Sequence, residues 1–201
     1  MTGLAYGVGR FGARRSAVAR VDGRIVDVAD LVPGPSLNQF MAAGPEAWRS
    51  VHEQVLARAD RAEAVEPDAL VLPFEVADYV DFYSSEHHAA NLGGLLRPGT
   101  EPLPPAWRHL PIGYHGRSAT IVVSGTAVER PHGIVATEDG PRFGPTQRLD
   151  VEVEVGFVVG VGGRRIPVEA AAEHVFGAVL VNDWSARDVQ AFEYQPLGPF
   201  L

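Results

Sequence analysis

The stretch Asp150-Val-Glu-Val-Glu-Val-Gly-Phe-Val-Val159 predicts a β-strand, because valines alternate with acidic residues along its first half. Strand side chains point alternately to two faces, which places Glu152 and Glu154 together on one face, beside Asp150. The other face is apolar and carries Val151, Val153, Val155 and Phe157. An exposed acidic face is ordinary in an antiparallel sheet. A buried one requires a positive partner between the carboxylates, for which a hard divalent cation is the usual solution.

The composition narrows the class of protein. The chain has 201 residues, 46% of them hydrophobic, which is enough to bury a core in one large or two small domains. Its formal net charge of -8 argues against nucleic acid as a partner, since phosphate binding relies on a basic surface. The absence of cysteine excludes disulfides, thiolate ligands and cysteine nucleophiles. With no apolar run of membrane-spanning length and no signal-peptide pattern, a cytoplasmic protein without membrane contact is expected.

The order of predicted elements indicates a strand-rich α+β protein. The 22 glycines and 16 prolines indicate many turns. Residues 16–21 and 24–28 are expected to form a hairpin around Asp22-Gly23, a strong two-residue turn signal. A helix is expected from Pro45 to Ala59, where apolar residues recur at helical spacing. Further strands are expected at 119–123, 151–159 and 178–181, and a further helix at 167–174.

One common cofactor-binding motif occurs in the wrong structural context, and one common catalytic motif is absent. Residues 7–12 satisfy the dinucleotide pattern G-x-G-x-x-G, but that pattern requires a helix after the third glycine, and a hairpin is expected in this region. No serine lies in a G-x-S-x-G turn, which argues against an α/β-hydrolase. Hydrolytic chemistry in this chain would therefore use water as the nucleophile.

Three segments concentrate polar side chains where the apolar pattern breaks. They are residues 81–97, 110–117 and 182–190. Each has a plain structural alternative: Asp183 could cap a following helix, Arg187 could pair with a surface carboxylate, and His88 could be an exposed loop histidine. Together the segments favour a functional site, because side chains of complementary chemistry recur in all three.

The same segments resemble the fumarylacetoacetase family. The matching motifs, in the family's order, are Asp81-Phe-Tyr-Ser-Ser85, Leu110-Pro-Ile-Gly-Tyr-His-Gly-Arg117, Asp150-Val-Glu-Val-Glu154, Asn182-Asp-Trp-Ser-Ala-Arg-Asp188, Glu193-Tyr194 and Pro196-Leu-Gly-Pro-Phe-Leu201. Tyr6-Gly-Val8 and Ser36-Leu-Asn-Gln-Phe-Met41 resemble the family's small N-terminal domain. The resemblance therefore runs along essentially the whole chain.

The resemblance implies a fold and an assembly. It implies an N-terminal SH3-like barrel domain over residues 1–70. It also implies that residues 71–201 form the first part of a fumarylacetoacetase-type mixed β-roll, which carries the catalytic site. The family's enzyme is a homodimer, so a homodimer is expected for the full-length protein.

Carried over residue by residue, the resemblance implies a catalytic site. The metal ligands would be Asp81, Glu152, Glu154 and Asp183. His88 would activate water; Glu86-His87-His88 departs from the family's Arg-Gln-His, but His88 keeps the spacing from Asp81. Arg187 and Gln190 would donate hydrogen bonds to the oxyanion. The residues that hold the substrate would be Tyr83, Arg97, Tyr114, Gln190 and Tyr194.

The implied reaction is hydrolysis of the carbon-carbon bond of 4-fumarylacetoacetate, a diketo acid, to fumarate and acetoacetate, which completes tyrosine and phenylalanine breakdown. Water adds to one carbonyl and the departing carbon leaves as an enolate. The metal would polarise the diketone oxygens as a Lewis acid. Four carboxylate ligands favour Mg²⁺ or Ca²⁺ without separating the two.

The resemblance also predicts an incomplete site. The family continues after Gly-Pro-Phe-Leu with Gly-Lys and later supplies a glutamate that orients the histidine. The chain is therefore expected to be an N-terminal fragment that is weakly active or inactive alone. Two alternatives are a related 2-oxo-acid hydrolase or decarboxylase on the same scaffold, and a metal-binding module without catalytic activity.

Overall fold

The computed structural model describes residues 3–194, so the motif at 196–201 lies outside the described residues. Contacts within the chain divide it into two units. Unit 1 consists of the residues up to Glu75 together with Val122–Thr126 and Val153–Asn182. Unit 2 consists of Val76–Ile121, Ala127–Glu152 and the residues from Asp183 onward. The division into domains at 1–70 and 71–201 stays a prediction.

Unit 1 contains a four-stranded antiparallel sheet with the strand order β3-β2-β1-β4. Its strands are β1 (Leu4–Phe11), β2 (Arg14–Val21), β3 (Arg24–Asp27) and β4 (Ala69–Val71). The hairpin predicted around Asp22-Gly23 is confirmed, because Val21 pairs with Arg24 and the two turn residues have positive φ, 48° and 85°. A two-residue hairpin turn requires this backbone, which Asp-Gly adopts readily. A closed SH3-like barrel is not confirmed and stays a prediction.

The glycine-rich residues 7–12 lie in β1 and in the turn after it. The segment that follows the third glycine is strand β2, and Phe11 pairs with Arg14 across the turn. A dinucleotide fold needs a helix at this point. A strand rather than a helix therefore follows the third glycine, in a β1–β2 hairpin that precedes the predicted one.

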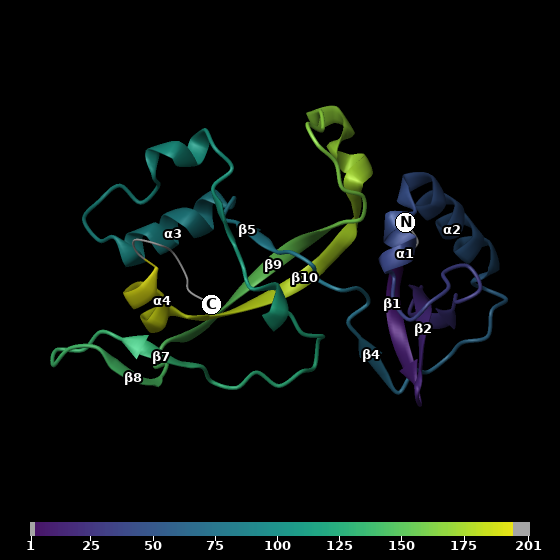
Figure 1. The fold of residues 1–201 in the computed structure, drawn as a ribbon, viewed down its shortest axis with the longest axis horizontal. Coiled ribbons are helices and arrows are strands. Elements are labelled where there is room, and N and C mark those ends of the chain that lie inside the picture. Colours follow the sequence, from purple (N-terminus) through teal and green to yellow (C-terminus); the bar gives the residue numbers. More distant parts are fainter. Residues whose placement is uncertain (1–2, 195–201) are drawn as a thin grey trace. The chain divides into compact units, whose positions relative to one another are not determined.

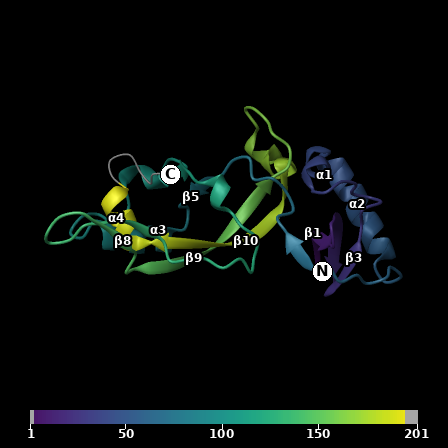
Figure 2. The ribbon, with the colours of Figure 1, turned by 60° about the horizontal axis from the view of Figure 1, so that its bottom comes forward.

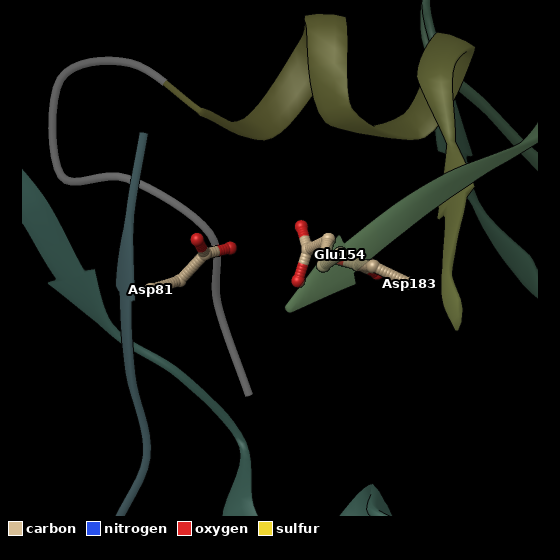
Figure 3. Close-up of side chains that lie close together, drawn as sticks. All are labelled: Asp81, Glu154 and Asp183. Carbon is tan, nitrogen blue, oxygen red and sulfur yellow. The ribbon is translucent and has the colours of Figure 1, made fainter. Parts of the chain in front are cut away.

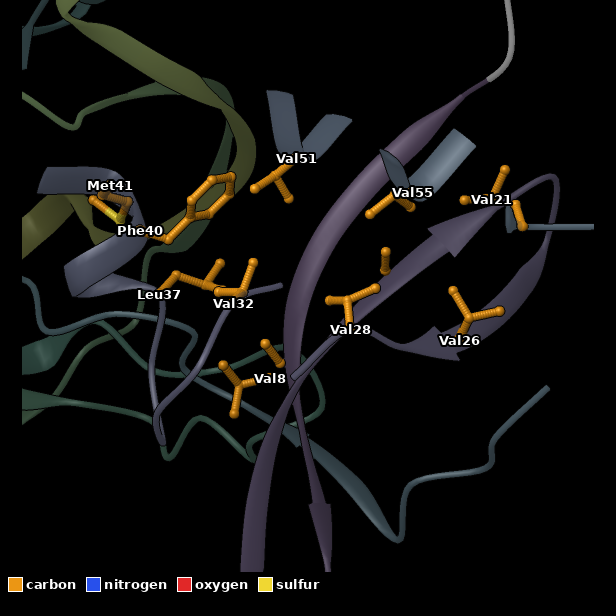
Figure 4. Packing of buried hydrophobic residues seen from close by; sticks show 13 residues of the cluster. Val8, Val21, Val26, Val28, Val32, Leu37, Phe40, Met41, Val51 and Val55 are labelled. Carbon is orange, nitrogen blue, oxygen red and sulfur yellow. The ribbon is translucent and has the colours of Figure 1, made fainter. Parts of the chain in front are cut away.

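Helices α1 (Asn38–Ala42) and α2 (Gly44–Arg58) pack against this sheet. The helix predicted from Pro45 to Ala59 is confirmed as α2, with the proline in its first turn, where a missing N–H breaks no intrahelical bond. Val51 and Val55 of α2 are buried against a valine-rich core (Figure 4). The valines of that core from the sheet and the loop after it are Val8, Val21, Val26, Val28 and Val32.

The Val153–Asn182 segment of unit 1 adds an aromatic residue, Phe176, to the same core. The helix predicted at 167–174 is present as a 3-10 helix, η3 (Val168–His174). Directly after it, the ring of Phe176 lies edge-on to Phe40 and Trp48, with centroids 5.4 and 5.3 Å apart. The indole nitrogen of Trp48 donates to the carbonyl of Phe40 at 2.9 Å, so the polar end of this partly buried side chain is satisfied.

Unit 2 is built from short elements. Its strand pairs are β5 (Val80–Phe82) with β6 (Gly113–His115) and β7 (His132–Val135) with β8 (Arg142–Pro145). Its helices are α3 (Glu86–Leu96) and α4 (Arg187–Glu193), with 3-10 turns η1 (Pro105–Arg108) and η2 (Ser118–Thr120). None of the helices within residues 3–194 is long and apolar enough to cross a membrane.

The strand predicted at 119–123 is wrong. Its first residues form the 3-10 turn η2, and no regular structure follows as far as Val123. The backbone N–H of Thr120 donates to Arg117 and that of Ile121 donates to Ser118. Local hydrogen bonds of this kind use the groups that a strand ladder would need.

Two long strands, β9 (Leu149–Val159) and β10 (Val175–Ala186), lie side by side in both views (Figures 1 and 2) and confirm the strands predicted at 151–159 and 178–181. The acidic face of β9 is the more covered one, because the Glu152 side chain is 16% exposed. The apolar face is open, with Val153 and Phe157 at 78% and 70% exposure. An exposed acidic face, the simpler of the two interpretations, is therefore wrong for Glu152.

Candidate metal and catalytic site

Asp81 is placed by the short β5–β6 pair. The antiparallel register sets Asp81 opposite Tyr114, and the phenol donates a hydrogen bond to the carboxylate. Burial raises the pKa of Tyr114, and the hydrogen bond to Asp81 and the negative charges of Asp81 and Asp183 raise it further. The phenol therefore keeps its proton at neutral pH and stays a hydrogen-bond donor.

Three carboxylates from different strands meet at one place. Asp81 from β5, Glu154 from β9 and Asp183 from β10 each offer one oxygen, and these oxygens lie within 4.8 Å of one another (Figure 3). Three hard oxygen donors at this spacing could hold a divalent cation such as Mg²⁺ or Ca²⁺. The donor set therefore fits the metal that the sequence analysis expected, and the identity of the ion and the ligand roles stay predictions.

The charge around Asp183 supports the same interpretation. Burial raises the pKa of Asp183, and the negative charges of Glu152 and Asp81 raise it further. The positive charges of Arg187 and Arg117 act in the opposite direction without cancelling the rise. The carboxylates thus repel one another more than the neighbouring arginines attract them, and an additional cation would relieve that repulsion.

Glu152, the fourth expected ligand, contacts one histidine and one arginine. Its Oε2 lies 3.0 Å from Nε2 of His88, and its Oε1 lies 2.5 Å from Nη2 of Arg187. Both Glu152 and Arg187 have side chains that are 16% exposed. A carboxylate has about four acceptor sites, so these contacts leave room for a further partner. The negative charge on the acidic face of β9 is therefore compensated in part by the protein itself.

His88 reaches Glu152 because of the way α3 begins. Ser85 has an extended backbone and caps the helix, with its hydroxyl accepting from the backbone N–H of His88 at 3.4 Å. In the first turn His88 is half-buried and meets Glu152, whereas His87 is exposed. The geometry thus favours His88 over His87, the choice made from its spacing to Asp81, and its role as the base stays a prediction.

Arg187 and Gln190 lie one turn apart on α4. Nη1 of Arg187 donates to Oε1 of Gln190 at 3.0 Å, while Nε donates to Oδ2 of Asp150 at 2.9 Å. Burial by itself would lower the pKa of Arg187, but hydrogen bonds and charge from Glu152 and Asp150 outweigh it and the pKa is raised. The guanidinium therefore stays charged beside the carboxylates.

The expected substrate residues are spread more widely. Tyr114 joins the carboxylates, as described above. Nη2 of Arg97 donates to the carbonyl of Pro102 at 2.8 Å and so holds the loop after α3. Tyr194 ends α4, with its backbone N–H donating to Gln190. Tyr83 borders a cavity of about 420 Å³ that is lined by Phe82, Tyr83, Ser84, Trp107, Leu110, Pro111 and Ile112.

Asp150 carries no predicted role, although the strand pattern places it on the acidic face with Glu152. In the structure Oδ2 of Asp150 accepts from Nε of Arg187 at 2.9 Å and forms an ion pair with Nη2 at 2.9 Å. The alternation of β9 already placed Asp150 two residues from Glu152 on the same face. That spacing was a sufficient signal for a shared partner, but nothing in the sequence identified the partner as Arg187.

The fold first defines a class. It is similar to the solved fumarylacetoacetate hydrolase from the psychrophile Exiguobacterium antarcticum, with a TM-score of 0.60 and 21% identity over 96% of this chain and 60% of that chain. The strand-rich α+β architecture is thus of the type found in that structure.

The sequence then identifies the family. The family model for the fumarylacetoacetate (FAA) hydrolase C-terminal domain matches residues 78–201, and the chain belongs to this family. It is 45% identical over 192 residues to fumarylacetoacetase from Bos taurus, which covers 86% of this chain and 46% of the bovine protein. It is 42% identical over 210 residues to fumarylacetoacetase from Caenorhabditis elegans, covering 88% and 50%. The resemblance inferred from the motifs is confirmed, and the chain spans about half the length of the curated relatives it matches.

Proposed function

We propose that this chain carries the metal-binding and water-activating residues of a fumarylacetoacetase, which hydrolyses the carbon-carbon bond of 4-fumarylacetoacetate to fumarate and acetoacetate. The observation that carries the proposal is the placement of Glu152 between His88 and Arg187, with Asp183 electrostatically coupled to it. This arrangement combines a candidate base, a candidate oxyanion donor and a cation-binding group. Family membership supports the reaction class.

The carboxylates of Asp81, Glu154 and Asp183 would hold the divalent cation, with Glu152 as the expected fourth ligand. When bound, such an ion supplies Lewis-acid polarisation of the diketone oxygens and stabilises the negative charge of the enolate. Mg²⁺ and Ca²⁺ both suit an all-oxygen set.

His88 would accept the proton of the attacking water. An ionised carboxylate only accepts hydrogen bonds, so Nε2, the nitrogen that faces Glu152 at 3.0 Å, carries the proton of the neutral ring. Nδ1 is then the acceptor. Glu152 would fix this tautomer and also stabilise the imidazolium that forms when water is deprotonated.

Arg187 and Gln190 would bind the oxyanion that forms when water adds to the carbonyl. The Arg187 charge is maintained by Asp150 and Glu152. Because Oε1 of Gln190 accepts from Arg187, its amide nitrogen is the end that can donate to substrate. Donors held in place before the reaction stabilise developing charge without reorganising during it.

Tyr114 would serve as a proton-retaining donor beside the carboxylates. The contacts of Tyr83, Arg97 and Tyr194 with the diketo acid, the homodimer and the weak activity of residues 1–201 alone stay predictions. The open apolar face of β9 supports a need for further covering surface in the active assembly.

The test is product analysis by proton NMR after incubation with 4-fumarylacetoacetate and Mg²⁺ or Ca²⁺, in a form of the enzyme long enough to turn over. Fumarate and acetoacetate in equal amounts are expected. Release of carbon dioxide would favour a decarboxylase on the same scaffold. Metal binding without any turnover in the full-length protein would favour a non-catalytic module and contradict the proposal.

A further inference from the structure

Thr146 and Asp188 form a hydrogen-bonded junction between segments that are 42 residues apart in the chain. Thr146 is fully buried, and its hydroxyl donates to Oδ1 of Asp188. The same hydroxyl accepts from the backbone N–H of Arg148 at 3.1 Å. Oδ2 of Asp188 accepts from the backbone N–H of Gln147 at 2.8 Å. Both carboxylate oxygens and both functions of the hydroxyl are therefore used.

The junction joins the start of α4 to the segment that leads into β9. Next to it, the backbone N–H of Arg187 donates to the carbonyl of Arg148 at 2.9 Å. The following residues of β9 supply Asp150 and Glu152, which bind the guanidinium of Arg187. The backbone and the side chain of Arg187 are thus both held by the same short segment, residues 148–152.

Helix α4 depends on such contacts for its position. It has seven residues, and a helix of that length has little stability of its own. Val189 is buried, and it packs so closely over Gly133 of β7 that a β-carbon there would lie 2.6 Å from the valine. Val189 therefore anchors the apolar side of α4, while Asp188 anchors its first turn.

We propose that Thr146 and Asp188 are positioning residues for Arg187 and Gln190. Neither touches the carboxylate cluster; they act by fixing where the first turn of α4 begins relative to Asp150 and Glu152. The inference rests on the proposed function for its catalytic meaning, but the geometry it describes exists without metal or substrate.

The test reads the Arg187 side chain directly. In a ¹H–¹⁵N NMR spectrum of the metal-free chain, the Nε–H of Arg187 is identified by its disappearance in Arg187→Lys. Because it donates to Asp150 at 2.9 Å, its signal is expected away from the position of free arginines and slow to exchange with water. Thr146→Val removes the hydroxyl and keeps the shape, and Thr146→Ser keeps the hydroxyl. Thr137→Val is the matched control, because the Thr137 hydroxyl donates to Gly140 in the loop between β7 and β8.

In Thr146→Val, the Arg187 signal is expected to move to the free-arginine position and to exchange about tenfold faster or more. Thr146→Ser and Thr137→Val should retain the wild-type signal. If Thr146→Val only lowered the global stability, its unfolding midpoint would fall while the Arg187 Nε–H signal of the folded protein stayed at the wild-type position. An unchanged Arg187 signal in folded Thr146→Val overturns the proposal, and so does an equal shift in Thr137→Val.

A wild-type experiment covers the case in which Thr146→Val does not fold. In a urea series below the unfolding midpoint, the Gln147 amide and the Arg187 Nε–H should lose their protection in the same step. Loss of one with retention of the other overturns the proposal. These readouts are independent of metal binding and turnover, so a failure of the proposed function would be seen separately.

Discussion

The carboxylate of Glu152 lies 2.5 Å from the guanidinium of Arg187, and each side chain is only 16% exposed. The two opposite charges stabilise each other in this largely buried position, because either charge alone would be poorly solvated. This ion pair links strand β9 to helix α4, so it contributes both to the stability of unit 2 and to the geometry of the candidate site.

Glu152→Gln is expected to destabilise the protein by about 1–3 kcal/mol, because the Arg187 charge loses its covered partner. Urea unfolding followed by circular dichroism measures the change. Glu86→Gln is the matched control: Glu86 pairs with Arg108, but the two side chains are 52% and 61% exposed, and such pairs contribute below about 1 kcal/mol. Equal losses in the two variants would contradict the role given to the covered pair.

Removing a carboxylate from the cluster should weaken metal binding. Glu154→Gln and Asp183→Asn are each expected to reduce the affinity for Mg²⁺ or Ca²⁺ by about tenfold or more, since each removes one charged oxygen donor. Isothermal titration calorimetry gives the affinities. Glu138→Gln, an exposed acid in the loop between β7 and β8, serves as the control and should bind like the wild type. If all three proteins bind the ion equally, the cluster is not the metal site.

Metal affinity should fall on acidification at a higher pH than for an ordinary aspartate site. Burial and the charges of Glu152 and Asp81 raise the pKa of Asp183. In the metal-free protein this carboxyl group therefore stays protonated to higher pH than an ordinary aspartate, whose pKa is about 3.9. The ion must displace that proton. Titrations in two buffers of different ionisation enthalpy should therefore reveal proton release that grows as the pH is lowered toward the Asp183 pKa. Proton release that is absent throughout the acidic range would contradict the raised pKa.

Asp188 should stabilise the folded protein at neutral pH and lose this contribution in acid. Burial alone would raise its pKa, but hydrogen bonds from Thr146, Gln147 and Val189 outweigh burial and the pKa is lowered. A lowered pKa in the folded state gives stability that is present above the unfolded pKa of about 3.9 and is lost as the pH falls through the folded value. The difference in unfolding free energy between wild type and Asp188→Asn should therefore shrink in acid. A difference that is constant from neutral pH to about pH 2 would exclude this linkage.

His88→Ala is expected to lower kcat by about a hundredfold or more, the usual contribution of a general base, in a form of the enzyme that turns over substrate. Binding of Mg²⁺ or Ca²⁺ should survive, because His88 contacts Glu152 rather than the clustered oxygens of Asp81, Glu154 and Asp183. His87→Ala is the control, since that side chain is exposed. A loss of activity in His87→Ala with none in His88→Ala would reverse the assignment of the base.

Local features of the chain could be predicted because local physics determines them. The Asp22-Gly23 hairpin depends on two residues that accept left-handed backbone, and α2 depends on apolar spacing with a proline at its start. The strand at 119–123 was predicted wrongly, because apolar β-branched residues there were outweighed by hydrogen bonds within the turn around Thr120.

The alternation in Asp150–Val159 determined by itself that Glu152 and Glu154 share a face, since successive strand side chains point to opposite sides. It could not determine which face would be covered. Tertiary structure decided that, by bringing His88 from α3 and Arg187 from α4 against the acidic side and leaving Val153 and Phe157 open. The junction of Thr146 with Asp188 was decided in the same way, because partners 42 residues apart meet only when the folded backbone carries both segments to one place.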